Sequence, residues 1–266
     1  MTISVLTKVQ RKINFAINIP LKVFKKPKRK DSVTSDLFPI RNDENWATEF
    51  EFLNLPGLIR GDIASSHKAT MVFFSDDGIE LGRKDIEIIG LGRSTVNLKD
   101  FLKDGLQGST TFAVFHERGS TAADLGESFM AERGYAGYKY KSIEVKGYVH
   151  GNLDAVSYSS GIIKKLGNSG FLKKTYFVQH LLTGPADYDF IVTNPTSKKI
   201  SVKPIIEVNG ITKKFKKYTI PSLGCHTFSV KIQETEIGKI KFRSYLYLGR
   251  PVVFRVAANS FDVFHG

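Results

Sequence analysis

The feature that most constrains the fold of this chain is an internal repeat. When the sequence is shifted by 132 positions, Gly78–Leu98 lies over Gly210–Val230 without a gap. Repeats are the first pattern to look for, because one unit folded twice decides the whole architecture. The identical pairs are Gly78/Gly210, Ile79/Ile211, Lys84/Lys216, Ile88/Ile220, Leu91/Leu223, Gly92/Gly224 and Thr95/Thr227.

Each copy of this block has the same local pattern. A glycine turn, at Gly78 and at Asn209-Gly210, requires residues that tolerate positive φ. A strand follows, then a tight turn carrying Leu-Gly, then a strand that alternates apolar and polar residues. The likeness extends to Gly108–Phe115 over Gly238–Tyr245 with a two-residue slip.

Further matches are expected on both sides of the block. Upstream, Ala69–Phe74 and Lys199–Ile206 are predicted to be the preceding strand of each copy. Downstream, Leu153–Val156 and Phe261–Phe264 are predicted to close the two copies. Helix signals are scarce and are confined to residues 8–16 and 122–131. Many short strands with regular turn signals favour an all-β sandwich fold.

The second copy also carries turn chemistry that is found in a known family. Val192–Val202, which contains Asn194-Pro195-Thr196, and then Tyr218–Gly224 resemble bacterial immunoglobulin-like domains. In that family an Asn-Pro-Thr corner ends one strand, and a proline-then-glycine turn separates two later strands. The resemblance implies a fold and carries no function. The first copy departs from it at Ser65-Ser66-His67, which lacks the proline.

These observations predict two tandem immunoglobulin-like β-sandwich domains behind a basic N-terminal arm. We expect an arm and linker over 1–45, a first sandwich over 46–161 with an insertion over 116–142, and a second sandwich over 162–266. A single eight-stranded barrel built from both halves is the alternative.

Charge is distributed unevenly along the chain. Residues 1–30 carry a net charge of +9, residues 31–161 of −7 and residues 162–266 of +11, and these sum to the +13 of the whole chain. A charge asymmetry of this kind often reports binding partners. The single cysteine, Cys225, excludes an internal disulfide framework and is typical of a reducing compartment. No apolar run is long enough to span a bilayer, so we expect a cytoplasmic protein, with the membrane periphery as a possible location.

The insertion is the favoured place for ligand binding, because long loops on a rigid sandwich often carry recognition residues. Aromatic rings there can stack on a sugar, and arginine can bind an acidic group. The plain structural interpretation is a surface loop, or a loop packed on the other domain. The candidate ligand-binding residues are His116, Glu117, Arg118, Glu132, Arg133, Tyr135, His150 and Asn152.

The six histidines, His67, His116, His150, His180, His226 and His265, show no metal-ligand spacing. Ordinary hydrogen-bonded histidines are the favoured interpretation, and we predict neither a metal nor a cofactor. The sequence also contains no nucleophile elbow, P-loop or dinucleotide-binding glycine pattern placed between a strand and a helix.

The basic arm is a candidate for binding an anionic surface. Lysine and arginine near a charged bilayer attract its headgroups, and the same side chains neutralise nucleic-acid phosphates, so both partners stay open through residues 8–30. A solvated leader and docking onto the acidic first copy are alternatives. The residues concerned are Lys22, Lys25, Lys26, Lys28, Arg29 and Lys30.

Together these features favour a non-enzymatic binding or scaffolding protein. The insertion would recognise a protein or carbohydrate ligand, and the arm would attach to an anionic surface. One alternative is an enzyme or accessory factor acting on carbohydrate or another polar small molecule, with a site around His116, Glu117, Arg133 and His150. Another is a viral or virus-like structural protein, because sandwiches with basic arms occur in particles. The sequence does not indicate an oligomeric state.

Overall fold

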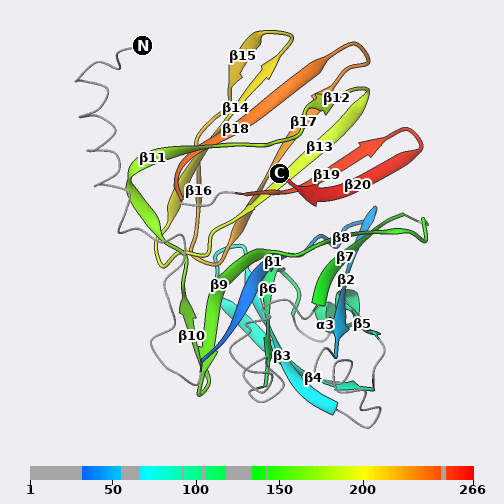
Figure 1. Ribbon diagram of the computed structural model, residues 1–266, viewed down its shortest axis with the longest axis vertical. Helices are drawn as coiled ribbons and strands as arrows, with labels where there is room; N and C mark the ends of the chain where they lie inside the picture. Colours follow the sequence, from blue (N-terminus) through cyan, green and yellow to red (C-terminus); the bar gives the residue numbers. More distant parts are fainter. Residues whose placement is uncertain are drawn as a thin grey trace, which may run out of the picture.

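The protein is all-β in the computed structural model (Figure 1), which describes residues 32–54, 66–90, 93–103, 106–117, 134–141, 143–246 and 250–266, with backbone alone for 103 and 152–154. Twenty strands and one short helix, α3 (Leu98–Lys103), lie in these residues. Four sheets result. We call residues 32–165 the first half and residues 166–266 the second half.

The first half forms two antiparallel sheets. Sheet A has six strands in the order β10-β9-β1-β6-β3-β4, and sheet B has four in the order β5-β2-β7-β8. The strands are β1 (Val33–Pro39), β2 (Trp46–Leu53), β3 (Ser66–Ser75), β4 (Glu80–Ile89), β5 (Arg93–Asn97), β6 (Ser109–His116), β7 (Gly134–Tyr140), β8 (Lys146–Val149), β9 (Asn152–Ser159) and β10 (Ile162–Lys165).

The second half also forms one six-stranded and one four-stranded sheet. Sheet C runs β11-β18-β14-β15, with β12 pairing β18 and β16 pairing β14, and sheet D runs β17-β13-β19-β20. The strands are β11 (Ser169–Phe177), β12 (Leu182–Thr183), β13 (Ala186–Thr193), β14 (Ile200–Val208), β15 (Ile211–Lys214), β16 (Tyr218–Ile220), β17 (Cys225–Ile232), β18 (Ile237–Leu246), β19 (Val252–Ala257) and β20 (Ser260–His265).

Eight strands of each half are paired in the same order, and β9, β10, β12 and β16 lie outside this match. The path β1-β6-β3-β4 in sheet A matches β11-β18-β14-β15 in sheet C, and β5-β2-β7-β8 in sheet B matches β17-β13-β19-β20 in sheet D. No described sheet combines strands of both halves, so the single barrel is wrong. The internal repeat is therefore a repeat of topology as well as of sequence.

The turns that define the repeat have the backbone geometry expected from sequence. Gly78 has a φ of 73° and Gly210 a φ of 81°. In the second half, Leu223 adopts a φ of 64° in the turn between β16 and β17. These left-handed positions explain why glycine is repeated at the first turn.

A buried asparagine directly follows β2 in the first half and β13 in the second half. Leu53 pairs with Arg93 and Thr193 with Cys225, so Asn54 and Asn194 are equivalent positions. Both are fully buried. Asn54 donates its amide to Gly90 O at 2.8 Å, and Asn194 donates to Pro221 O at 2.9 Å and to Ile220 O at 2.9 Å. The first-copy counterpart of the Asn-Pro-Thr corner is thus Asn54, and the sequence alignment to Ser65-Ser66-His67 was wrong.

Apolar side chains from the two sheets of each half meet in a core. In the second half, Phe190 of sheet D and Phe242 of sheet C have ring centroids 5.8 Å apart. In the first half, Phe50 of sheet B lies 5.6 Å from Phe112 of sheet A. Aromatic pairs at this separation contribute packing beyond their buried area.

The first core continues into the second half. Sheet D presents its outer side chains Ile191 and Phe254 to the first half, where Trp46 and Tyr138 contact Phe254 at centroid separations of 4.9 and 4.8 Å. Arg41 joins the halves electrostatically through Asp189. Figure 1 shows β19 and β20 lying directly against the end of the first half that carries β7 and β8. The halves are therefore packed together.

Several sequence-based boundaries need correction. Val33–Pro39, assigned to the linker, forms β1 between β9 and β6. Ile162–Lys165, assigned to the second sandwich, pairs with β9 of the first half. The downstream match is also wrong, because β20 pairs with β19 as β8 pairs with β7, whereas Leu153–Val156 lies in β9 and pairs with β1. Side-chain periodicity reports strands but does not reveal their partners.

Candidate functional site

The outer face of sheet B carries the most concentrated polar chemistry in the described structure. Strand β2 alternates strictly: Phe50 and Phe52 point into the core, so Glu49 and Glu51 point to the opposite face. Both glutamates are nevertheless buried, at 5% and 6% exposure. A buried carboxylate must be paired, and neighbouring strands supply the partners.

Three cations and one phenol surround the two carboxylates. Lys146 Nζ lies 2.6 Å from Glu49 Oε2 and 2.9 Å from Glu51 Oε1, so one ammonium bridges both groups. The other contacts are Lys139 Nζ to Glu49 Oε1 at 2.6 Å, Arg93 Nη1 to Glu51 Oε2 at 3.3 Å and Tyr148 OH donating to Glu51 Oε1 at 2.6 Å. Three cations against two carboxylates leave this cluster with one net positive charge.

Gly137 makes this arrangement possible. It lies on β7, between Glu49 on β2 and Tyr148 on β8. A Cβ at this position would lie 3.1 Å from Tyr148 Cε1 and 3.4 Å from Lys146 Cδ. Because no side chain rises from β7 there, the β8 side chains reach across it to the β2 carboxylates.

The cluster fixes the protonation of its carboxyls. Burial by itself would raise the pKa of Glu49, but the contacts from Lys139 and Lys146 outweigh it and hold the pKa below its usual value. The same balance, with Lys146 and Tyr148, lowers the pKa of Glu51. Burial and the hydrogen bond to ionised Glu51 together raise the pKa of Tyr148. Both carboxylates are therefore ionised acceptors at neutral pH.

A cavity of about 300 Å³ opens beside Glu51, and it is lined by Glu51, Leu53, Arg93, Tyr135 and Tyr148. Such a volume is at the lower end of the range for small-molecule sites. Arg93, with 68% of its side chain exposed, and Tyr148, 42% exposed, offer a guanidinium and a ring to an incoming molecule. We call Glu51, Arg93, Tyr135 and Tyr148 the sheet B site.

The described residues of the second half form no counterpart of this site. Register through the repeat makes Glu51 equivalent to Ile191, because their partners Thr95 and Thr227 are equivalent. Ile191 is buried in the core shared by the halves. The same face of the repeated unit is thus used for packing in one copy and carries the polar cavity in the other.

The predicted ligand residues are distributed over several places. Tyr135 lies in β7 and lines the cavity. Glu117 Oε1 accepts the Lys68 amide at 2.9 Å. Arg118, Glu132 and Arg133 lie outside the described residues, as do the arm residues Lys22, Lys25, Lys26, Lys28, Arg29 and Lys30 and both candidate helices. Asn152 lies in β9, where only the backbone is described.

The two candidate histidines have different partners. His116 is buried at the end of β6, where its Nδ1 lies 2.9 Å from His67 Nε2. His150 lies where the halves meet, with its ring centroid 4.3 Å from that of His265 and its Nδ1 3.5 Å from Arg250 Nη2. In the residues that the structure describes, no group of three or more His, Cys, Asp and Glu side chains is arranged to hold a metal ion.

The predicted insertion over 116–142 is shorter than expected. His116 belongs to β6, and Gly134–Tyr140 forms β7, the counterpart of β19. The segment that differs between the copies therefore runs from 117 to 133, against 247–251. The alternation Glu-Phe-Glu-Phe at 49–52 was the available signal for the sheet B site, but sequence alone does not show that Lys139, Lys146 and Tyr148 lie beside it.

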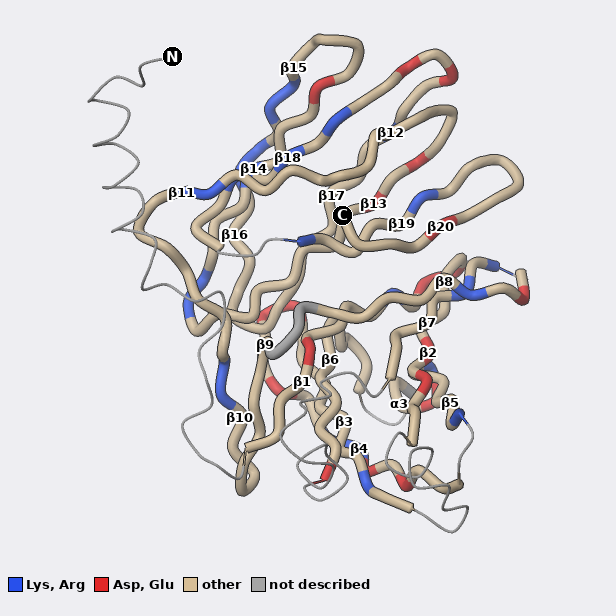
Figure 2. Tube along the Cα trace, viewed as in Figure 1, with Lys and Arg blue, Asp and Glu red and all other residues tan. Residues whose placement is uncertain are grey.

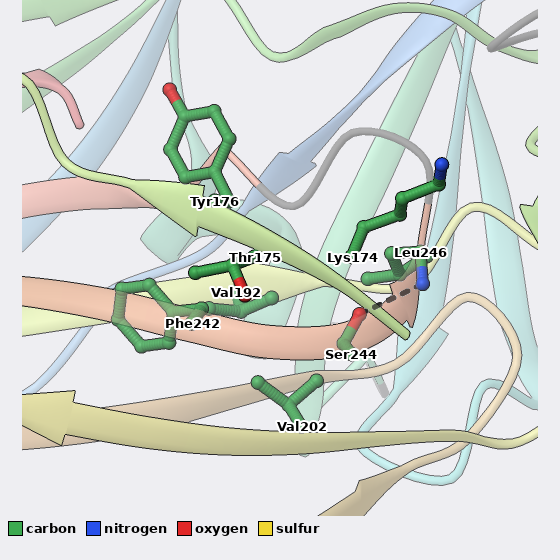
Figure 3. Close-up of a pocket in the computed structure, with 8 residues that line it drawn as sticks. All are labelled: Lys174, Thr175, Tyr176, Val192, Val202, Phe242, Ser244 and Leu246. Atoms are coloured by element: carbon green, nitrogen blue, oxygen red, sulfur yellow. Dashed lines mark hydrogen bonds between the residues drawn. The ribbon is translucent and has the colours of Figure 1, made fainter. Parts of the chain in front are cut away.

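A second cavity lies in the core of the second half (Figure 3). It measures about 40 Å³ and is lined largely by apolar groups, including Val192, Val202 and Phe242. Its volume suits about one water molecule, and Ser244 Oγ, one of the polar groups that line it, already accepts the Leu246 amide at 2.7 Å. At this volume the void is too small for a ligand of the size that the cavity beside Glu51 could hold.

Comparison with known proteins gives no family for this chain. No family model matches it, and no curated protein matches it. Among solved structures, a β-glucuronidase from glycoside hydrolase family 2 is similar at 12% identity with a TM-score of 0.20, covering 87% of this chain and 23% of that one. The Parabacteroides merdae β-glucuronidase is similar at 11% identity with a TM-score of 0.17, covering 86% and 26%.

An anti-sigma factor domain-containing protein is similar at 7% identity with a TM-score of 0.16, covering 89% of this chain and 90% of that one. The chain spans about a quarter of the length of the two glucuronidases. At these scores the likenesses carry no argument about activity. Within the described ranges, no helix is both long and apolar enough to cross a membrane.

Proposed function

We propose that this protein is a non-enzymatic binding protein of two tandem immunoglobulin-like sandwiches, with its ligand bound at the sheet B site. The supporting observation is the open cavity in which Tyr135, Tyr148 and Arg93 surround the ionised Glu51 carboxylate. The duplicated topology and the two sheet-pair cores support the sandwich interpretation. The Asn194 corner and the turn before β17 support the immunoglobulin-like one.

The chemistry of the cavity favours a hydroxylated ligand of about one saccharide unit. Tyrosine rings stack on the apolar face of a sugar, while carboxylate and guanidinium groups bind its hydroxyls or an acidic substituent. The net positive charge of the cluster suits a neutral or acidic sugar. The rigid β2, β7 and β8 strands hold the first contacts before a ligand arrives, which reduces the ordering cost of binding.

The same cluster argues against the enzyme alternative at this position. Hydrolysis by a carboxyl pair needs one member protonated, with a raised pKa, to donate to the leaving group. Here Lys146 bridges Glu49 and Glu51, and the pKa of both is lowered. Neither carboxyl is then a proton donor at neutral pH, whereas Glu51, which lines the cavity, remains an acceptor for ligand hydroxyls.

Titration of the full chain against a panel of neutral and acidic saccharides, followed by calorimetry, tests this proposal. We expect Tyr135→Ala and Arg93→Met each to weaken binding at least tenfold, because each removes one wall of the cavity. Arg83→Met is the matched control, since Arg83 pairs with Glu80 on β4, away from sheet B. Binding that survives both site variants, or is absent for every saccharide, contradicts the proposal.

The basic arm supplies a second, separate part of the proposed function. We infer from its charge that the arm attaches the protein, in the cytoplasm, to an anionic surface, either the periphery of a membrane or nucleic acid. The residues concerned are Lys22, Lys25, Lys26, Lys28, Arg29 and Lys30. Replacing all six with glutamine in the full chain tests this. If co-sedimentation with anionic vesicles and with nucleic acid is unchanged at two salt concentrations, the arm has no such role.

A further inference from the structure

The outer face of sheet C is a second charged surface, far along the chain from the arm. Side chains along β14 and along β18 point alternately into the core and out to the surface. Val202 and Phe242 point into the core, and in each strand the residues next to the core-facing ones point outward. Five of the outward side chains are cations, and we call them the basic face: Lys203, Lys214, Lys239, Lys241 and Arg243. Blue segments mark β14, β15 and β18 in Figure 2.

The register places these cations beside one another with little compensation. Lys203 lies directly opposite Arg243 on the neighbouring strand, an arrangement in which like charges repel. None of the five forms an ion pair with a described residue, although Glu207 is the cross-strand neighbour of Lys239. Lys241 Nζ lies 5.4 Å from the centroid of the Phe177 ring, a contact that supplies no counter-charge. A face whose repelling cations have no anion paired with them among the described residues is suited to an anionic partner outside the molecule.

Apolar side chains project at the edge of the same sheet. On β11, Ser169 pairs with Leu246 and Lys174 with Ser244, so four β11 residues lie opposite a single β18 residue, Tyr245. This looped-out segment exposes Phe171 by 89% and Leu172 by 55%. Lys173, in the same segment, lies over the Tyr245 ring at 5.6 Å.

We propose that the basic face and the Phe171-Leu172 loop form a binding surface for anionic lipid bilayers. Lysines on a flat sheet attract negatively charged headgroups without needing directional contacts, since ammonium is a compact, hydrated charge. Large apolar side chains beside such cations enter the boundary between headgroups and acyl chains. Single-stranded nucleic acid is less well matched, because bases stack on exposed rings spread across a face, whereas the two exposed rings, Phe171 and Phe177, both belong to the edge strand β11.

This surface belongs to the second half and shares no residue with the sheet B site. It is also separate from the arm in sequence, because its residues lie on β11, β14, β15 and β18 of sheet C. A protein attached through it would hold sheet C against the membrane.

Vesicle co-sedimentation of the full chain tests the proposal, using phosphatidylcholine alone and phosphatidylcholine doped with phosphatidylserine. The arm-neutralised variant with six glutamines serves as the background in which the folded surface is measured by itself. We expect this background to bind the doped vesicles, and to bind pure phosphatidylcholine at least tenfold more weakly. We expect Lys203→Glu/Arg243→Glu to weaken binding to the doped vesicles at least tenfold.

A loop variant and a charge control distinguish entry of apolar side chains into the bilayer from a general effect of net charge. Phe171→Ser/Leu172→Ser leaves the net charge unchanged, and we expect it to reduce binding several-fold, most clearly at high salt where electrostatic attraction is screened. Lys99→Glu/Lys141→Glu makes the same charge change in the first half and should leave binding unaltered. Circular dichroism and thermal unfolding verify that each variant is folded.

Three results would overturn the proposal. One is an arm-neutralised background that fails to bind doped vesicles. Another is an equal loss in the control and in the basic-face variant, which would reduce the effect to net charge. The third is tighter binding of this background to a single-stranded oligonucleotide than to doped vesicles, lost in Lys203→Glu/Arg243→Glu, which would assign the face to nucleic acid.

Discussion

Lys146 Nζ lies 2.6 Å from Glu49 Oε2, although their strands, β8 and β2, are separated by β7. A Cβ on Gly137, the β7 residue paired with Glu49, would lie 3.4 Å from Lys146 Cδ and 3.1 Å from Tyr148 Cε1, so a larger side chain there would occupy the space through which both residues pass. A single glycine therefore lets three strands share one charge cluster, and the sheet B site is built on that cluster.

Gly137→Val fills the space over which Lys146 and Tyr148 reach. Because a Cβ added at this position would lie 3.1 Å from Tyr148 Cε1, the two further methyl groups of valine should displace both residues from the glutamates. We expect saccharide binding to fall at least tenfold, with unfolding free energy reduced by about 1–3 kcal/mol through overpacking and lost pairing. Calorimetry and urea unfolding measure the two effects. Unaltered binding would show that the position of Tyr148 does not matter for the ligand.

Lys146→Met removes the ammonium that bridges Glu49 and Glu51. Glu49 then keeps Lys139 as a partner, and Glu51 keeps Arg93 and Tyr148. We expect the free energy of unfolding at neutral pH to fall by about 1–3 kcal/mol. The lowered pKa values imply that this stabilisation is complete above pH 4.5 and is lost as pH falls through the folded-state values. Urea unfolding from neutral to acidic pH should show the variant and the wild type converging in acid.

His265→Gln tests the junction between the halves. Burial first, then Arg250 and His150, lower the pKa of His265 to about 3. The unfolded chain binds this proton below pH 6.5, so the wild type loses stability as pH falls from there towards 3. Between pH 7.5 and pH 5 the loss is at most about 2 kcal/mol before solvent screening. The glutamine variant should lose less unfolding free energy than the wild type over this pH range, as measured by urea unfolding. An identical pH dependence in the two proteins would contradict the lowered pKa of His265.

Arg41→Met tests the electrostatic joint between the halves. Arg41 Nη2 lies 2.6 Å from Asp189 Oδ2, and its guanidinium lies 4.7 Å from the ring centroids of both Trp46 and Phe254. Methionine keeps the apolar stem but removes the cation, so that the Ser229 hydroxyl is the remaining partner of Asp189. We therefore expect the free energy of unfolding to fall by about 1–3 kcal/mol. Trp46, the single tryptophan, reports the change by fluorescence during urea unfolding. Arg83→Met serves as the control, with an effect below about 1 kcal/mol because that pair is more exposed.

The thiol of Cys225 should be unreactive in the folded protein. Burial dominates and raises its pKa to about 11, and Sγ lies 3.8 Å from Thr110 O. Because the thiolate is the reactive form, labelling by a disulfide reagent near pH 8 should be at least tenfold slower than in urea. Equal rates in both states would show that Cys225 is accessible.

Local chemistry explains what could be predicted about the fold. Positive φ at Gly78 and Gly210, the strands on either side of them and the turn before β17 follow from residue types alone. The equivalence of Asn54 and Asn194 could not be predicted, because it appears only when Leu53 pairs with Arg93 and Thr193 with Cys225. Helix α3 was also missed, since a six-residue helix gives little periodic signal.

The candidate site was predictable only in part for the same reason. Of the eight proposed ligand residues, Tyr135 lines the cavity, while Glu51, Arg93 and Tyr148 lie on strands whose sequence pattern predicts no site. These four residues are up to 97 positions apart along the chain and meet because β2 pairs with both β5 and β7.

The sequence by itself determined that this protein is all-β and internally duplicated, because turn residues and alternation act over a few positions. Only the tertiary structure decided how the two copies differ. In the second half, the outer face of sheet D packs against the first half and buries Ile191. In the first half, the equivalent face of sheet B is left open beside Glu51. Long-range pairing brings those residues together, and no local property of the chain encodes which face is covered.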